Sequence, residues 1–233
     1  MNEVRQRILN RLTQALHRYP PVSHPRGLLE QAVTQVVGGR REWIARFGQE
    51  LERLGGAWEY METVAAARLR LLSRFQTEQV RRVLSWSPEL LPLPGLSDAL
   101  SAIGVEVIVP DFRARDRMSV LQQATEVDWG ITGAEAALAN TGTVVVRSGP
   151  GFCRLASLIT PKHLALVPVS RLYPNLEAWL AELRKDGRAR EFFADASNVT
   201  FISGPSRTAD IEMTPVLGVH GPRQMEVLLF EER

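Results

Sequence analysis

A segment rich in hydroxyl, glycine and arginine side chains near the C-terminus has the residue types best suited to binding an anion. It runs from Ser203 to Glu212 and directly follows the apolar stretch Val199–Ile202. At the end of a parallel strand, hydroxyls and exposed amides donate hydrogen bonds to an anion, and a guanidinium matches a carboxylate or phosphate. We therefore predict a ligand-binding loop, although a surface ion pair between Arg207 and Asp210 explains the arginine equally well. The expected loop members are Ser203, Gly204, Pro205, Ser206, Arg207 and Thr208.

Four ionisable side chains in or near such turns are candidates for proton transfer. Asp210 and Glu212 are helix caps, a proton-transfer pair or solvated charges. His220 stands in a tight turn with Gly221-Pro222 before the last apolar stretch, and it is the histidine best placed for a function. Glu135 is expected in the first turn of a helix, where its charge also complements the helix dipole. The residues alone assign no catalytic role among these four.

A glycine- and threonine-containing turn lies in the middle of the chain. Residues 134–140 are predicted to form a short helix that starts after a strand ending near Gly133. Gly142 suits the left-handed position that follows a helix, but capping does not explain both Thr141 and Thr143. Loops that follow parallel strands meet at one edge of a sheet, so we expect the loop from Thr132 to Glu135, which opens this helix, to converge with the two C-terminal turns.

The spacing of apolar residues predicts an N-terminal helical arm and one α/β domain. Val4, Ile8 and Leu12 recur at helical spacing before a proline pair, and we assign residues 1–40 to the arm and 41–233 to the domain. Nearly continuous apolar stretches then alternate with amphipathic ones, which predicts an open, mostly parallel sheet flanked by helices. The expected strands are 57–61, 80–86, 105–109, 128–132, 143–147, 163–169, 199–202 and 225–230. The expected helices of the domain are 43–54, 63–75, 96–103, 118–125, 134–140 and 176–184, with a further helix over 28–37 in the arm.

Composition limits the class of protein. The chain has 233 residues, of which 45% are hydrophobic and 23% charged, as is typical of a globular protein. A net charge of +2 without a basic patch gives no reason to expect a nucleic-acid partner. No signal sequence is recognisable, and no apolar stretch approaches the roughly 18 residues of a membrane span, so we expect a cytoplasmic protein without a membrane span.

Several cofactor and catalytic signatures are missing. The single cysteine, Cys153, cannot by itself hold zinc or an iron–sulfur cluster, and no HExxH or comparable ligand spacing occurs, so no metal site is predicted. The glycine-rich dinucleotide fingerprint, the P-loop and the G-x-S-x-G nucleophile elbow are also absent. These absences argue against bound NAD, P-loop nucleotide chemistry and α/β-hydrolase catalysis.

Four blocks of residues, taken in order, resemble the LutC/YkgG lactate-utilization family. They are residues 131–143, 161–163, 202–212 and 218–223, and the resemblance extends from about Val127 to Phe230. It implies a LUD domain with a fold similar to the NagB/RpiA and CoA-transferase group. It also implies a protein that acts with two partners, one with cysteine motifs and one with ferredoxin-like clusters, to oxidise L-lactate to pyruvate. The iron–sulfur clusters would then lie on the partner subunits, with no cofactor in this chain.

The resemblance also nominates site residues, without supplying a mechanism. Matched to the family's blocks, they are Gly133, Glu135, Thr141, Gly142, Thr143, Ser203, Gly204, Pro205, Ser206, Arg207, Asp210, Glu212, His220, Gly221 and Pro222. This chain has Asn140 where the family usually has glutamate, and an amide cannot serve as a general base at neutral pH. Our hypothesis places a small anionic ligand against Arg207, with His220 and Glu135 around it.

Two other functions compete with a subunit of a lactate-oxidising complex. The first is a free-standing isomerase, CoA-transferase or ligase-type enzyme of the same fold group. The second is a regulatory or structural module whose N-terminal arm docks on a partner or on a second copy, which would make the protein a homo-oligomer. The fold alone cannot choose among them, because function depends on the site.

Overall fold

The computed structural model describes residues 2–17, 38–110, 117–209 and 215–232, which belong to two units divided between Val33 and Thr34. In the first unit, α1 (Asn2–His17) is the predicted amphipathic helix, and the apolar side chains of Val4, Ile8 and Leu12 are exposed. The helix predicted over 28–37 lies outside the described residues. Within the described ranges, no helix combines the length and the apolar character needed to cross a membrane. The architecture below is that of the second unit.

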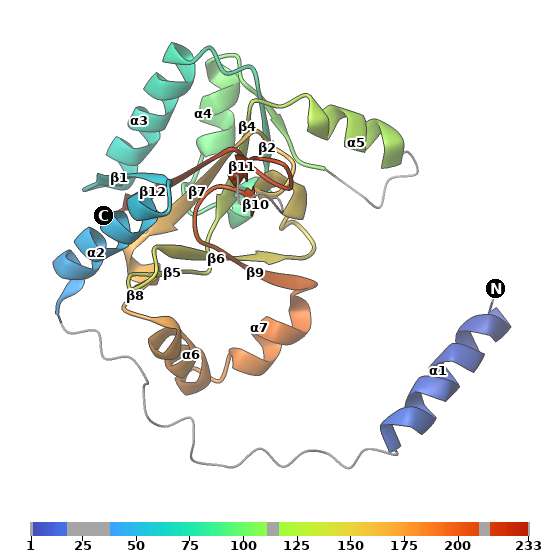
Figure 1. Ribbon diagram of the computed structural model, residues 1–233. Coiled ribbons are helices and arrows are strands. Elements are labelled where there is room, and N and C mark those ends of the chain that lie inside the picture. The colour runs from blue at the N-terminus through green and yellow to red at the C-terminus, as the bar shows by residue number, and fades with distance from the viewer. Residues whose placement is uncertain (1, 18–37, 111–116, 210–214, 233) are drawn as a thin grey trace. The chain divides into compact units, whose positions relative to one another are not determined.

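A six-stranded parallel sheet forms the centre of the second unit (Figure 1). Its strand order is β1-β12-β7-β4-β2-β3, and every neighbouring pair is parallel. The central strands β4 and β7 are almost entirely buried, as expected for a sheet covered on both faces. This confirms the predicted open, mostly parallel α/β architecture. The strands are β1 (Ala57–Met61), β2 (Arg82–Ser85), β3 (Glu106–Ile108), β4 (Trp129–Gly133), β7 (Lys162–Pro168) and β12 (Gln224–Phe230).

A second sheet of four strands, in the order β8-β5-β6-β9, corrects two of the predictions. The strands are β5 (Ala136–Leu138), β6 (Thr143–Ser148), β8 (Leu172–Tyr173) and β9 (Asn198–Ile202). The helix predicted over 134–140 was wrong, because the middle of this segment forms β5, which pairs with β6 and β8 and is fully buried. The expectation that Ser203 follows a parallel strand was also wrong, because β9 is antiparallel to β6.

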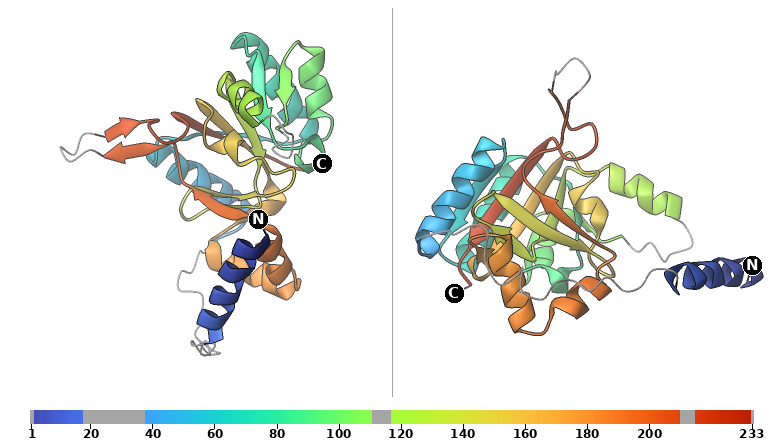
Figure 2. Two further views of the ribbon diagram at one scale, coloured as in Figure 1. Left: turned by 90° about the vertical axis from the view of Figure 1, so that its right-hand side faces the viewer. Right: turned by 60° about the horizontal axis from the view of Figure 1, so that its bottom comes forward.

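A two-stranded hairpin follows β9 and the turn that contains Pro205. Strands β10 (Arg207–Ala209) and β11 (Pro215–Leu217) pair antiparallel. They extend away from the two sheets, as the left view of Figure 2 shows. The predicted loop therefore leads into a projecting hairpin rather than into a helix.

Helices cover the outer faces of the two sheets. Helices α3 and α4 contribute to the core of the six-stranded sheet, whereas α6 and α7 pack on the outer face of the four-stranded sheet (Figure 1). Side-chain caps fix two helix starts, because Thr63 accepts a hydrogen bond from the amide of Ala66 and Asn175 accepts one from that of Ala178. The helices are α2 (Arg40–Arg53), α3 (Val64–Thr77), α4 (Leu96–Ala102), α5 (Arg117–Thr125), α6 (Leu176–Lys185) and α7 (Ala189–Asp195).

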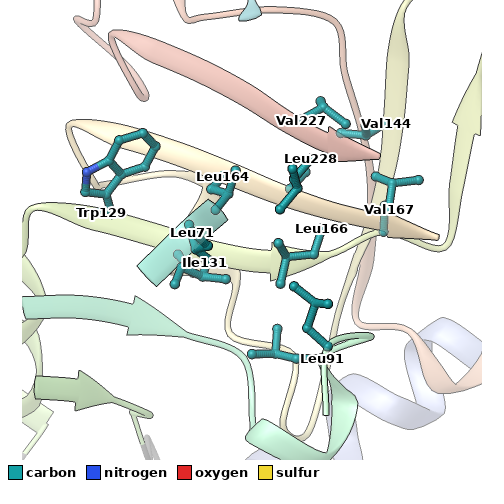
Figure 3. Packing of buried hydrophobic residues seen from close by; sticks show 14 of the residues in the cluster. Leu71, Leu91, Trp129, Ile131, Val144, Leu164, Leu166, Val167, Val227 and Leu228 are labelled. Carbon is teal, nitrogen blue, oxygen red and sulfur yellow. The ribbon is translucent and has the colours of Figure 1, made fainter. Parts of the chain in front are cut away.

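The alternation of side chains along the parallel strands explains how both faces of the central sheet are covered. Figure 3 shows Leu71 of α3 beside Ile131 and Leu164 on one face. On the other face, Val144 of the second sheet lies next to Val227. Because successive residues of a strand point to opposite faces, the continuous apolar character of these strands supplies both contacts.

Candidate functional site

Three hydroxyl groups meet where β6 begins and β9 ends. The Oγ1 atom of Thr143 lies 2.7 Å from the Oγ atom of Ser203, and it donates a hydrogen bond to the Oγ1 atom of Thr141 over 2.8 Å. Thr143 is buried, whereas Thr141 and Ser203 are exposed. The buried hydroxyl therefore holds the two exposed hydroxyls in place, where they can donate to or accept from a ligand. We call Thr141, Thr143 and Ser203 the hydroxyl cluster.

The Ser-Gly-Pro-Ser-Arg turn and the His-Gly-Pro turn lie against each other. The amide of Ser206 donates to the carbonyl of Pro222 over 2.9 Å, and the amide of Gly218 donates to the carbonyl of Ser206 over 2.9 Å. A Cβ atom on Gly221 would lie 3.0 Å from the Cβ atom of Ser206, so a larger residue would push the two turns apart. The structure thus brings together two segments that the sequence separates by a hairpin.

Two turns of the site, one at Gly142 and one at Gly204, pack against the last turn of α2. Gly142 has φ +56°, and a Cβ atom there would lie 2.4 Å from the backbone nitrogen of Leu51. Gly204 has φ +103°, and its Cβ atom would lie 2.9 Å from the carbonyl oxygen of Leu54. Only glycine combines a left-handed conformation with such close approach to another backbone. Gly142 was predicted to follow a helix, but it lies in the turn between β5 and β6.

Arg207 is exposed and donates a hydrogen bond from its guanidinium to the carbonyl of Leu54, the residue that caps the C-terminus of α2. A cation at this position complements the negative end of the helix dipole. One of its five N–H donors is engaged in this bond, and no other side-chain partner of Arg207 occurs among residues 2–17, 38–110, 117–209 and 215–232.

The loop amides have protein partners rather than an open anion nest. The amide of Gly204 donates to the Sδ atom of Met225 over 3.2 Å, and the amide of Ser206 donates to Pro222. These two amides are therefore not free to bind a ligand, whereas the hydroxyl cluster and Arg207 offer other donors. The loop amides had been expected to take part in anion binding.

Two of the predicted residues, Gly133 and Glu135, lie apart from this site. Gly133 is at the carboxyl end of β4, where it pairs with Leu166 of β7. Leu166 pairs in turn with Leu228 of β12, which is six residues beyond Pro222. At about 3.3 Å per residue, that separation is about 20 Å. Glu135 precedes β5, whereas Thr143 pairs with the other end of that strand. The predicted convergence at the carboxyl edge therefore fails, because His220-Gly221-Pro222 precedes β12 and so lies at the amino edge.

Glu135 has a partner of its own. Its carboxylate lies 3.0 Å from the Nε atom of Arg147, and the guanidinium of Arg147 stacks on the ring of Phe152 at 3.9 Å. This ion pair belongs to the far end of β6. The hypothesis that placed Glu135 beside Arg207 is therefore not consistent with the strand register.

The remaining predicted residues are placed as follows. Thr208 lies in β10 opposite Val216, and His220 is exposed in the turn before β12. Pro205 lies next to the Gly55 turn after α2, since its Cγ atom is 3.8 Å from the Cβ position of Gly55. Asp210 and Glu212 lie outside the described residues. The contribution of the α2 terminus, at Leu54 and Gly55, had no motif by which the sequence could have revealed it.

Asn140 lies close to the hydroxyl cluster in sequence and has a buried, unsatisfied acceptor. Its amide nitrogen in the backbone donates to the carbonyl of Pro174 over 3.0 Å. Its side-chain oxygen is buried without a hydrogen-bond partner among the described residues. Buried polar atoms are rarely left unpaired in native proteins. The side-chain oxygen of Asn140 is therefore an acceptor that a water molecule or a ligand can satisfy.

A buried histidine lies on the central sheet, outside the site. The Nε2 atom of His163 is 2.9 Å from the Oγ1 atom of Thr132. Burial lowers the pKa of His163 to about 4, so the imidazole is neutral at pH 7. His163 is thus a satisfied packing residue of β7.

The described part of the chain has no group of three or more histidine, cysteine, aspartate or glutamate residues arranged to hold a metal ion. Cys153 is buried, and burial raises the pKa of its thiol, which is therefore protonated at neutral pH.

Comparison with known proteins identifies relatives over most of the second unit. A family model described as LUD domain matches residues 44–230. Lactate utilization protein C of Halalkalibacterium halodurans is 37% identical over 153 residues, which cover 66% of this chain and 64% of that protein. Lactate utilization protein C of an Exiguobacterium species is 40% identical over 112 residues, covering 47% of this chain and 46% of that protein. The matches thus span less than two thirds of the length of these curated relatives.

A solved structure shows the same fold. The crystal structure of a DUF162 family protein from Deinococcus radiodurans at 1.70 Å resolution superposes with a TM-score of 0.56 and 20% sequence identity. The superposition covers 83% of this chain and 99% of that chain. The arrangement of two sheets described above is therefore one that another protein adopts.

Proposed function

Because the chain belongs to the LUD-domain family, we propose that it acts in lactate utilization, as a subunit without an iron–sulfur cluster that binds a small 2-hydroxy or 2-oxo acid anion. The names of its relatives support the lactate assignment. The presence of a single, buried cysteine supports the absence of a cluster, because clusters are held by several thiolates.

The observation that carries this proposal is that the hydroxyl cluster and the exposed Arg207 both lie at the last turn of α2. A 2-hydroxy acid has a carboxylate next to a hydroxyl. Arg207 can bind the carboxylate through N–H donors other than the one bonded to Leu54, and Thr141 and Ser203 can exchange hydrogen bonds with the neighbouring hydroxyl or oxo group. Hydroxyl pairs both donate and accept, so the same cluster can bind lactate and pyruvate.

The oxidation itself requires a partner. Conversion of L-lactate to pyruvate releases two electrons and two protons, and we place the electron acceptor on iron–sulfur clusters of partner subunits. His220 stands in the turn that packs against Ser206, and among the described residues it is our candidate for accepting a proton. Asn140, which stands where the family usually has glutamate, cannot act as a base because its side chain is a neutral amide.

Calorimetric titration with L-lactate and pyruvate tests the binding step. Thr143→Val preserves shape but removes the hydroxyl that links the cluster, and Arg207→Gln removes the charge; each should weaken binding at least tenfold. Thr77→Val is the matched control, because Thr77 is an exposed residue at the end of α3. Unchanged affinity in both site variants would remove this site from the proposal.

Affinity purification of the full chain tests the subunit role. We expect two cluster-containing proteins to copurify, and lactate-dependent electron transfer only when all three proteins are present. Lactate oxidation or another turnover by the isolated chain would instead favour the free-standing enzyme.

A further inference from the structure

A cavity of about 450 Å³ lies at the opposite end of β6 and β9 from the hydroxyl cluster. Ser148 lines it and is five residues along β6 from Thr143, a distance of about 17 Å in an antiparallel strand. The other lining residues come from the ends of β3 and β9, from α5 and from the segment after β6. They are Val109, Pro110, Leu121, Gly149, Gly151, Phe152, Cys153, Arg154, Leu155, Ser197 and Asn198.

The cavity lies beside the point where the strand order of the parallel sheet reverses. From β2 the chain passes to β3 on one side, whereas the next parallel strand after β4 is β7 on the other side. Open α/β sheets bind ligands in the crevice at the carboxyl ends of two such strands. The cavity wall reaches this point, because the amide of Ser87, just after β2, donates to the carbonyl of Gly151 over 2.9 Å.

One wall of the cavity is aromatic and held firmly in place. The ring of Phe152 meets the ring of Trp86 edge to face at 4.8 Å, and the Arg147 guanidinium covers it at 3.9 Å. Val109 and Leu121 add further apolar surface. A fixed aromatic ring beside aliphatic side chains suits a flat, apolar ring of a ligand.

Two polar side chains give the cavity a preference for an anion. Arg154 has the one formal charge among the lining residues that the structure describes, and it has no ion-pair partner in that part of the chain. Ser148 is 6% exposed and adds a polar side chain to the cavity lining. Burial keeps the Cys153 thiol neutral by raising its pKa, so this thiol does not offset the charge of Arg154.

We propose that this cavity binds a mononucleotide, with the base against Phe152 and the phosphate on Arg154. The volume falls within the 300–1,000 Å³ typical of ligand pockets, and a molecule of the size of lactate would leave most of it unfilled. A single nucleotide also agrees with the missing dinucleotide fingerprint. This second site is independent of the lactate site proposed above.

Calorimetric titration of the full chain with AMP and FMN tests the proposal. Both should give saturable binding, whereas adenosine and ribose 5-phosphate, which lack the phosphate and the base respectively, should bind at least tenfold more weakly than AMP. Arg154→Gln should weaken AMP binding at least tenfold. Val109→Trp, at a position 40% exposed, should abolish it by filling the cavity. Arg184→Gln, at an exposed arginine of α6, is the matched control and should bind AMP like the original chain.

The result that would overturn the proposal is saturation by neither nucleotide, or equal AMP affinity in the original chain and both cavity variants. Ribose 5-phosphate binding as tightly as AMP would also overturn it, because the aromatic wall would then have no role. The lactate site is separable in the same experiment. Thr143→Val should lose lactate binding and retain AMP binding, and Arg154→Gln should do the reverse.

Discussion

The buried imidazole of His163 predicts a specific loss of stability in mild acid. The side chain is 1% exposed in the centre of the parallel sheet, and Thr132 is its hydrogen-bond partner. Burial lowers its pKa from 6.5 to about 4. The folded protein therefore keeps the imidazole neutral at pH values where the unfolded chain already binds a proton.

The sign and size of the effect follow from proton linkage. Below pH 6.5 the unfolded chain takes up a proton that the folded chain does not, so the free energy of unfolding falls with falling pH until about pH 4. With these two pKa values, the loss between pH 7.5 and pH 5 is about 2 kcal/mol. Arg70 lowers the pKa of Glu59 through a hydrogen bond, and the pKa of Glu78 is also lowered. The folded protein therefore keeps both side chains ionised throughout the range from pH 7.5 to pH 5, and their contributions to stability are lost only at lower pH.

Urea unfolding at pH 7.5, 6 and 5, followed by circular dichroism, measures this dependence. His163→Gln replaces the imidazole with a neutral amide that can still bond to Thr132, and it should lower stability at pH 7.5 but flatten the pH dependence. His220→Gln changes an exposed histidine and should leave the dependence in place. A pH-independent stability in the original chain, or an unchanged slope in His163→Gln, would refute the reasoning.

Two further substitutions test the packing of the site and of the charged network on the sheet. Gly142→Ala should destabilise the protein by roughly 2–3 kcal/mol, because it adds a clash with α2 to the strain of a positive φ. Gly187 is the control, because it has φ +69° but no atom within 4 Å of its Cβ position. Gly187→Ala should therefore lower the free energy of unfolding, measured with heat or urea, by only about 1 kcal/mol. Equal losses would show that the contact with α2 is unimportant. Arg74→Met should cost about 2 kcal/mol, since it leaves the 12% exposed carboxylate of Glu226 without its bidentate partner. Adding Glu226→Gln to Arg74→Met should recover part of that loss, and a further loss in the double variant would contradict the assignment.

Much of the central sheet could be predicted, because its strands are encoded locally. The predicted strand at 57–61 matches β1, and the others of the parallel sheet agree to within a few residues. Residues 134–140 were assigned wrongly because alanine, leucine and glutamate favour a helix. Pairing of Ala136–Leu138 with two neighbouring strands, at full burial, outweighs that preference.

The sequence predicted several residues of the site better than it predicted the position of the site on the sheet. The turns at Ser203 and Gly221 do lie together, but strand direction decided which edge of the sheet they occupy. The antiparallel pairing of β9 with β6 depends on contacts between distant residues, which no local pattern reports. The same limit applies to the cavity, whose walls come from Val109, Ser148 and Asn198 without any shared motif.

A crystal structure of the chain grown with saturating L-lactate tests the central claim most directly. We predict that the lactate carboxylate lies within hydrogen-bond distance of the Arg207 guanidinium, with the lactate hydroxyl on Thr141 or Ser203. Lactate bound at another place, with the hydroxyl cluster and Arg207 free of it, would contradict the account.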